Sequence, residues 1–195
     1  MSKPHNFSAG PGILPEEVLK QASDACINFD NLNLSLLEIS HRSKNYEKVI
    51  DESHAIIKEL FEVGDDYDVM YLGGGASLQF AMVPYNLLKD SGYAAYVNTG
   101  VWASKAIKEA KIIGNTKVIA SSEDKKFSYI PKGYEIPSDA DYLHITSNNT
   151  IYGTQMTSFP KTNIPLVCDM SSDIFSRKVN AKDFGLADHM SEEFV

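Results

Sequence analysis

Residues 68–88 read DVMYLGGGASLQFAMVPYNLL and combine the features that decide the fold class. The short apolar run at 68–72 predicts a buried strand, and the small residues at 73–77 predict a tight turn. Residues 78–88 then predict a helix, which Pro84 is expected to kink. A short buried strand followed directly by a helix is the repeating unit of a layered α/β fold.

The same alternation extends in both directions from this stretch. Ahead of it, Pro15 and the acids that follow predict the start of a helix running to about Phe29, and a second, amphipathic helix is expected at 46–61. After it, one helix is expected within 100–110, and strands are expected at 93–97, 117–120, 142–146 and 166–168. Residues 125–140 are polar and predict a surface excursion. We therefore expect an α/β fold with a layered, largely parallel sheet.

Composition and charge narrow the function classes. The 195 residues include 18 basic and 26 acidic side chains, giving a formal net charge of −8. Nucleic acids and anionic membranes are not attracted to such a surface, so neither is an expected partner. No apolar run approaches the roughly 18 residues that a membrane-spanning helix needs. Cys26 and Cys168 lie far apart and no signal-like segment follows Met1, which favours a reduced, cytoplasmic setting.

The turn at 73–77 is the first candidate site. Free amides at a helix N-terminus and the helix dipole favour an anion, and Ser77 adds a hydroxyl. The turn therefore predicts a phosphate site, although a flexible turn without a ligand has the same composition. Two better-known phosphate turns do not fit. A P-loop needs a Gly-Lys-Ser/Thr triplet, which the chain does not contain. A dinucleotide-binding turn needs a Gly or Ala where this chain has Leu78, and an acidic residue where it has Asn98. A nicotinamide-dependent enzyme is accordingly disfavoured.

Three further expected strands end in residues that a cofactor could use. Trp102, the single tryptophan, could stack on a flat ring or could simply pack in the core. The run 147–153 offers hydroxyl and amide donors, among them Thr150, as many surface turns do. Asp169 follows a buried apolar strand, where a carboxylate needs a cation or donor such as a protonated pyridine nitrogen. Capping a helix is the alternative role for Asp169.

His41 and Arg42 are the last candidate. Two adjacent cationic donors beside hydroxyls suit the carboxylate or phosphate of a substrate. A solvated, charged turn explains the same two residues at least as well. No catalytic residue and no metal site is predicted from the sequence.

Eight short motifs occur in a characteristic order along the chain. They are NFSAGP at 6–11, EISHR at 38–42, GGGASLQF at 73–80, VPYNLL at 83–88, GVWA at 100–103, IKEAK at 107–111, NNTIYG at 148–153 and CDMSS at 168–172. Together they resemble the phosphoserine aminotransferase family, which is a class-V, fold-type I family of pyridoxal 5'-phosphate (PLP) enzymes. The resemblance runs from about Asn6 to Leu186.

The resemblance implies a PLP site in the large domain of a fold-type I transferase. In this family the turn matching Ala76 and Ser77 binds the PLP phosphate through backbone amides. The tryptophan matching Trp102 stacks on the cofactor ring, and the threonine matching Thr150 bonds the ring hydroxyl. The aspartate matching Asp169 pairs with the pyridine nitrogen.

The resemblance also implies a reaction and an assembly. The family exchanges an amino group between glutamate and the phosphorylated 2-oxo acid 3-phosphohydroxypyruvate, giving phosphoserine for serine biosynthesis, and in some bacteria it serves pyridoxine biosynthesis. The pair matching His41 and Arg42 helps to hold this small-molecule substrate. Family members are cytoplasmic homodimers whose active sites are shared across the interface.

Two departures from the family pattern matter. Many members carry an arginine where this chain has Ser77. After Leu186, members continue to a lysine that forms the Schiff base with PLP, whereas residues 187–195 read ADHMSEEFV and no lysine follows Lys182. We therefore expect an N-terminal loop at 1–15, an incomplete, truncated PLP-binding large domain at 16–186, a tail at 187–195 unlike the family, and no C-terminal small domain. Such a chain is expected to be inactive alone. The alternative is a non-catalytic fragment that binds PLP or phosphate, or that dimerises.

Overall fold

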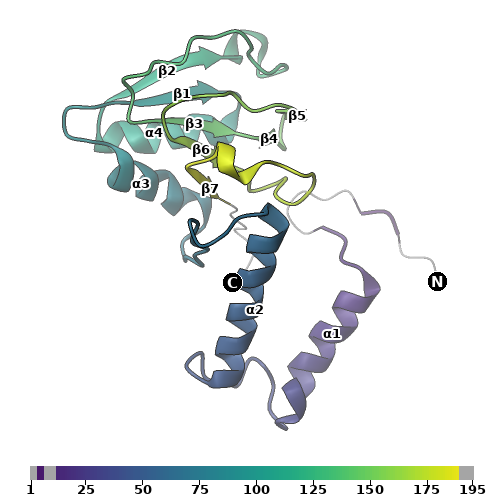
Figure 1. Ribbon diagram of the computed structural model, residues 1–195. Coiled ribbons are helices and arrows are strands. Elements are labelled where there is room, and N and C mark those ends of the chain that lie inside the picture. Colours follow the sequence, from purple (N-terminus) through teal and green to yellow (C-terminus); the bar gives the residue numbers. More distant parts are fainter. Residues whose placement is uncertain (1–3, 7–11, 189–195) are drawn as a thin grey trace. The chain divides into compact units, whose positions relative to one another are not determined.

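The computed structural model describes residues 4–6 and 12–188, which divide into two compact units (Figure 1). The first unit extends to Val69 and the second begins at Met70. Most of the motif at 6–11 and most of the tail at 187–195 lie outside the described residues. The domain limits expected at residues 15 and 186 stay a prediction.

The first unit is helical. Its elements are α1 (Glu16–Ile27), the short 3-10 helix η1 (Phe29–Asn31) and α2 (Lys44–Phe61). Helix α1 begins directly after Pro15, whose fixed φ suits the entry to a helix. Helix α2 begins after Ser43, whose hydroxyl accepts a hydrogen bond from the Tyr46 amide at 3.3 Å. Both predicted helices are confirmed.

The second unit is an α/β layer structure, whose described part has two α-helices and two short 3-10 helices. Its helices are α3 (Gly75–Leu87), α4 (Val101–Ile113) and the short 3-10 helices η2 (Glu123–Lys125) and η3 (Ala181–Asp183). Its strands are β1 (Ala94–Asn98), β2 (Thr116–Ser121), β3 (Tyr142–Thr146), β4 (Asn148–Asn149), β5 (Thr154–Gln155), β6 (Leu166–Asp169) and β7 (Leu186–Asp188). The four strands and the helix predicted after residue 88 are confirmed to within a few residues.

Five of these strands form a parallel sheet in the order β2-β1-β3-β6-β7 (Figure 1). The chain passes from β1 through α4 to β2, then crosses to β3 on the other side of β1. Strand order therefore reverses between β1 and β3, and ligands of open α/β sheets bind at the carboxyl ends beside such a reversal. The short strands β4 and β5 pair separately as an antiparallel hairpin.

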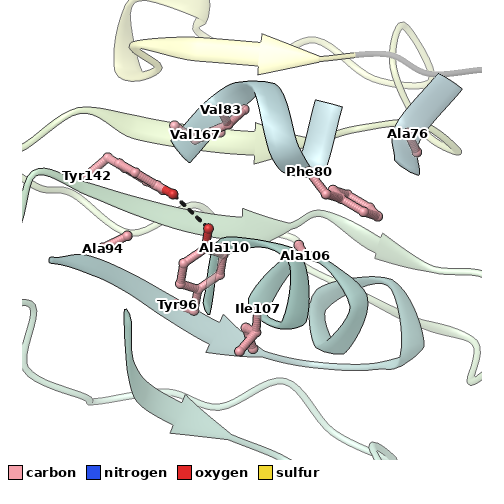
Figure 2. Close-up of a cluster of buried hydrophobic side chains, with 10 residues drawn as sticks. All are labelled: Ala76, Phe80, Val83, Ala94, Tyr96, Ala106, Ile107, Ala110, Tyr142 and Val167. Carbon is pink, nitrogen blue, oxygen red and sulfur yellow. Dashed lines mark hydrogen bonds between the residues drawn. The ribbon is translucent and has the colours of Figure 1, made fainter. Parts of the chain in front are cut away.

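Helices α3 and α4 cover one face of this sheet, as Figure 2 shows. Phe80 and Val83 of α3 lie over the sheet near Val167, and small residues of α4 pack beside them. Tyr96 and Tyr142 join hydroxyl to hydroxyl at 2.7 Å inside this cluster, so two buried polar groups satisfy each other.

Irregular segments cover the opposite face of the sheet, and this corrects one prediction. Residues 125–140 were expected to be a surface excursion, yet Phe127 and Ala140 are buried. Ile130 and Ile136 also pack against the apolar cluster on this face of the sheet. The segment has no helical or strand periodicity because it is an irregular loop. Its few apolar residues cover the face of the sheet that α3 and α4 leave free.

The predicted strand at 68–72 is wrong. Met70, Tyr71 and Leu72 have no strand geometry, and Met70 is 66% exposed. A strand needs a neighbour for its hydrogen bonds, and no described strand pairs with this segment. Helix α3 also begins three residues earlier than predicted, at Gly75, and it contains Pro84 without interruption.

Candidate functional site at the carboxyl edge of the sheet

The start of α3 has the geometry of an anion site. Gly74 and Gly75 have φ values of 98° and 61°, which side-chain-bearing residues rarely adopt, and a Cβ on Gly74 would lie 2.3 Å from Leu78 Cδ2. No described side chain caps this end of α3, and its first turn has no acidic residue. The first-turn amides can therefore bind an anion beside Ala76, which is buried, and Ser77, which is exposed.

Three polar side chains line the carboxyl ends of the central strands. Asn98, Thr146 and Asp169 are the last residues of β1, β3 and β6. Side chains two or four residues apart in a strand share a face, and Tyr96, Tyr142 and Val167 belong to the cluster beneath α3 and α4. The three polar side chains therefore lie on the helix-covered face, at the edge where α3 and α4 begin.

Asp169 is nearly buried, with 4% of its surface exposed. Its Oδ1 accepts hydrogen bonds from the amide of Ser171 at 3.0 Å and from the hydroxyl of Ser171 at 2.5 Å. This is the side-chain turn typical of Asp, and the residues after it form turns instead of a helix. The helix-cap alternative is therefore wrong, and the carboxylate is held at the strand end.

Trp102 lies in the first turn of α4 and is half buried against the apolar cluster. The Lys105 ammonium group lies over the indole, 4.3 Å from the ring centre, and covers one of its faces. Helix α4 is tied to β1 because Ser104 Oγ donates to Asn98 Oδ1 at 2.9 Å. The start of α4 is thus fixed to the strand end that it follows.

Thr150 is exposed at the turn of the β4–β5 hairpin. Its neighbour Asn149 is buried and fixes the hairpin to the end of β1, where Thr99 Oγ1 donates to Asn149 Oδ1 at 3.3 Å. Asn149 Nδ2 donates in turn to Thr154 Oγ1 at 3.0 Å across the hairpin. Sequence reasoning included Asn149 in the candidate run 147–153 but did not single it out, because an amide in an Asn-Asn-Thr turn has no distinguishing pattern.

Two buried polar side chains of β3 have atoms without a partner among the described residues. They are both ring nitrogens of His144 and the Oγ1 of Thr146. The His144 ring stacks on Tyr96 with 5.0 Å between ring centres and contacts Phe80 edge-on. Burial lowers the pKa of His144 from 6.5 to about 4, so its imidazole is neutral near pH 7. Thr146 Oγ1 remains available to a polar ligand at the strand ends.

His41 and Arg42 belong to the first unit. They form the turn ahead of α2, and both are exposed. The Arg42 amide donates to Ser40 Oγ at 3.2 Å, so the backbone of this turn is locally ordered. Their role in binding a substrate stays a prediction.

The described residues show neither a candidate metal site nor a candidate membrane-spanning helix. Residues 4–6 and 12–188 contain no group of three or more His, Cys, Asp or Glu that could hold a metal ion. None of the helices within these residues is both long and apolar enough to span a membrane.

Comparison with known proteins places this geometry in a family. The sequence model of the class-V aminotransferases matches residues 5–190. The chain belongs to the class-V aminotransferase family. It is 57% identical over 185 residues to the phosphoserine aminotransferase of Flavobacterium johnsoniae. This alignment covers 94% of this chain and 52% of the relative. It is 54% identical over 189 residues to the protein of the same name from Porphyromonas gingivalis, and this alignment covers 94% of this chain and 52% of that protein. The chain thus spans about half the length of these relatives.

Solved structures agree with the sequence relatives. Phosphoserine aminotransferase from Bacillus circulans subsp. alkalophilus matches with a TM-score of 0.89 and 47% identity, over 93% of this chain and 51% of that one. The PLP-bound phosphoserine aminotransferase of Trichomonas vaginalis matches with a TM-score of 0.87 and 28% identity, over 99% of this chain and 56% of that one. The resemblance and the fold class predicted from the sequence are confirmed.

PLP is the cofactor of this family, and the residues present fit it. The start of α3 offers first-turn amides with no described side-chain cap and no acidic residue beside them, which suits a phosphate. The buried carboxylate of Asp169 suits a protonated ring nitrogen, and the unpartnered Thr146 Oγ1 lies on the same face. These groups converge at one edge of the sheet in the second unit.

Proposed function

We propose that these residues form the PLP-binding part of a phosphoserine aminotransferase. The observation that carries the proposal is the common location of the α3 start, Trp102 and Asp169 at the carboxyl edge of one parallel sheet. One small molecule with a phosphate at one end and a basic ring nitrogen at the other fits such an arrangement. The relatives named phosphoserine aminotransferase support the same reading.

Each predicted cofactor-binding residue has a definite task in this proposal, and that of Thr150 is to bond the ring hydroxyl. The amides at Ala76 and Ser77 bind the phosphate, and the α3 dipole favours its charge. Trp102 stacks on the ring with the face that Lys105 does not cover. Asp169 keeps a proton on the ring nitrogen. When bound, PLP supplies an electron-withdrawing ring that carries an amino group from one substrate to the next.

The family also supports a proposal for the substrates and the assembly. Glutamate would give up the amino group, and 3-phosphohydroxypyruvate would receive it for serine biosynthesis in the cytoplasm. His41 and Arg42 would bind the anionic groups of that substrate as cationic donors. A homodimer would cover apolar side chains that α1 and α2 leave exposed, since neither helix has a buried residue.

The proposal includes a limit on the 195 residues taken alone. Transamination needs an amine that holds the cofactor and carries a proton, and family members supply it from a lysine past the matched motifs. This chain has no lysine after Lys182. We therefore expect noncovalent cofactor binding without turnover.

Binding is tested with pyridoxamine phosphate, the amine form of the cofactor, because it has no aldehyde to react with surface lysines. Titrating it into the 195-residue chain should quench the fluorescence of Trp102, the single tryptophan. Asp169→Asn should weaken binding about tenfold or more, because a charged partner of the ring nitrogen is lost. A titration of the unaltered chain that shows no binding by fluorescence or equilibrium dialysis contradicts the site.

Turnover is tested separately. The purified 195-residue chain with glutamate, 3-phosphohydroxypyruvate and PLP should form no phosphoserine, followed by mass spectrometry. Phosphoserine formation by this chain would overturn the expected inactivity while leaving the cofactor site intact. Binding and turnover are thereby decided by different measurements.

A further inference from the structure

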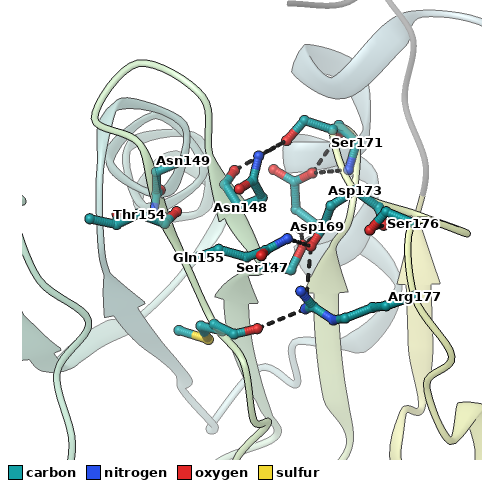
Figure 3. Close-up of polar contacts among 12 residues, drawn as sticks. Ser147, Asn148, Asn149, Thr154, Gln155, Asp169, Ser171, Asp173, Ser176 and Arg177 are labelled. Carbon is teal, nitrogen blue, oxygen red and sulfur yellow. Dashed lines mark hydrogen bonds and ion pairs between the residues drawn. The ribbon is translucent and has the colours of Figure 1, made fainter. Parts of the chain in front are cut away.

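Asp173 has a buried carboxylate at the centre of a polar cluster (Figure 3). Its side chain is 5% exposed, and three donors surround it. Ser147 Oγ donates to its Oδ1. Gln155 Nε2 donates to its Oδ2 at 3.0 Å, and Arg177 Nη2 lies 3.3 Å from the same oxygen. A buried carboxylate with a cation and two neutral donors is fully compensated.

The cluster joins two segments of the candidate cofactor site. Ser147 and Gln155 stand at the base of the hairpin that carries Thr150. Asp173 follows Asp169 by one short turn at the end of β6. Ser147 also donates its amide to the Asp169 carbonyl at 2.9 Å, and its hydroxyl oxygen lies 3.1 Å from the same carbonyl oxygen. The hairpin base is therefore bonded both to Asp169 and to Asp173.

Arg177 closes the cluster from its outer side. Its Nη2 donates to the Met156 carbonyl at 2.7 Å and also reaches Asp173, so one guanidinium bridges the two segments. The Met156 amide donates to the Ser147 carbonyl at 2.8 Å, which completes the hairpin base. The cation is partly exposed and compensates a carboxylate that burial would otherwise make unfavourable.

We propose that Asp173 is a positioning residue for the cofactor ring. It holds the Thr150 hairpin in one arrangement relative to Asp169, and these two residues would contact the ring hydroxyl and the ring nitrogen. The hydrogen bonds and the ion pair that the described residues of this cluster make to Asp173 involve no residue from the start of α3, the phosphate end of the site. This inference rests on the proposed function, and it predicts an effect on the ring end alone.

Asp173→Asn is the informative change because it preserves shape. The carboxylate faces donors on both oxygens, whereas an amide has one acceptor oxygen and one NH₂ group. Even the better orientation, with the amide oxygen toward Gln155 and Arg177, removes the negative charge that pairs with Arg177 and turns the NH₂ group toward Ser147, whose hydroxyl must then accept instead of donate. The hairpin base should therefore shift or open.

Asp141→Asn is the matched control. The Asp141 side chain is 6% exposed and pairs with Lys89 at 3.6 Å, so its burial and charge resemble those of Asp173. It also accepts a hydrogen bond from the Lys89 amide at 3.0 Å. Asp141 directly precedes β3, at the amino edge of the sheet, opposite the candidate site.

The experiment compares two ligands on both variants. Asp173→Asn should weaken pyridoxamine phosphate binding about tenfold by Trp102 fluorescence, while inorganic phosphate binding by phosphorus NMR stays unchanged. Asp141→Asn should alter neither affinity. Unchanged pyridoxamine phosphate affinity in Asp173→Asn, or equal losses for both ligands, overturns the inference. Equal losses of pyridoxamine phosphate affinity in both variants also overturn it. An unaltered chain that binds no pyridoxamine phosphate overturns the proposed function and this inference together.

Amide hydrogen exchange supplies a readout independent of the ligand. The amides of Ser147 and Met156 should exchange about tenfold faster in Asp173→Asn than in the unaltered chain or in Asp141→Asn, because both belong to the hairpin base. Unchanged exchange at these two amides contradicts the proposed link between Asp173 and the hairpin. Faster exchange with unchanged pyridoxamine phosphate affinity shows that the cluster holds the hairpin without setting the ring site, which also overturns the inference.

Discussion

Gly100 and Asn149, far apart in the chain, approach so closely that a Cβ on Gly100 would lie 2.7 Å from Asn149 Oδ1. The same oxygen accepts the hydrogen bond from Thr99. Gly100 immediately precedes α4, whose first turn carries Trp102, and Asn149 immediately precedes Thr150. The absence of a side chain at Gly100 therefore lets two segments of the candidate site meet.

Gly100→Ala should destabilise the chain. The added methyl group would displace Asn149 from its contact with Thr99, at an expected loss of about 1–3 kcal/mol in the free energy of unfolding. Urea denaturation followed by circular dichroism measures this loss. Gly64→Ala is the control, because its Cβ would meet only Asp66 Oδ1, at 3.4 Å. Equal stability of both variants would refute the close approach.

The stability of the chain should fall as the pH decreases from about 7 to about 5. Burial lowers the pKa of His144 from 6.5 to about 4, so the unfolded chain binds a proton in this range and the folded chain does not. The neutral imidazole thus contributes stability above the unfolded pKa, and this contribution is lost as the pH falls toward the folded pKa. At pH 5 the expected loss is about 2 kcal/mol.

His144→Phe should remove most of this pH dependence. The phenyl ring keeps the aromatic contacts with Tyr96 and Phe80 and removes the two ring nitrogens that have no described partner. The free energy of unfolding should be measured by urea denaturation at both pH values. His41→Gln is the control, since His41 is exposed. An identical pH slope in the unaltered chain and in His144→Phe would exclude His144 as its source.

Ser77→Asp should affect stability and ligand binding in opposite directions. A negative charge in the first turn of α3 interacts favourably with the helix dipole and should stabilise the chain by about 0.3–1 kcal/mol. The same charge repels a phosphate, so pyridoxamine phosphate affinity should fall more than about tenfold. Binding of pyridoxamine, which has no phosphate, should be unchanged. Ser77→Asn is the neutral control, and equal effects on the two ligands would argue against a phosphate site at this turn.

The buried tyrosine pair should be strongly non-additive. Tyr96→Phe leaves the Tyr142 hydroxyl without its 2.7 Å partner and should cost about 1–3 kcal/mol, as should Tyr142→Phe. The double variant removes both hydroxyls and should be less destabilised than either single variant. Thermal unfolding of the four proteins measures the coupling. Additive losses would show that the two hydroxyls do not depend on each other.

Much of the fold could be predicted from local patterns. The helix after Pro15, the amphipathic helix at 46–61 and the strand at 142–146 follow from periodicity and capping residues, which act over a few neighbouring positions. The apolar run at 68–72 misled the same reasoning, because an apolar segment becomes a strand only where another strand pairs with it. Phe127 was missed for a related reason, since a covering loop has no period.

The candidate site divides in the same way. Asp169 directly follows a predicted strand and Trp102 comes a few residues after another, so both were candidates, and the roles that the resemblance gave them stay predictions. Asn149 was predicted only as a member of the run 147–153, and Asp173 and Arg177 were not predicted, because the hydrogen bonds of these residues reach partners distant in the chain. The local sequence around Asp173 does not distinguish it from a solvent-exposed turn residue.

The sequence by itself determined the alternation of helices and strands, the glycine turn that begins α3 and the position of Asp169 at a strand end, because these depend on interactions between near neighbours. Only the tertiary structure decided that β1 lies between β2 and β3, that Asn98, Thr146 and Asp169 share one face of the sheet, and that Asp173 bonds the hairpin base. Strand order and buried hydrogen bonds join residues that are distant in the chain, and the free energy of such contacts exists only once the sheet has formed.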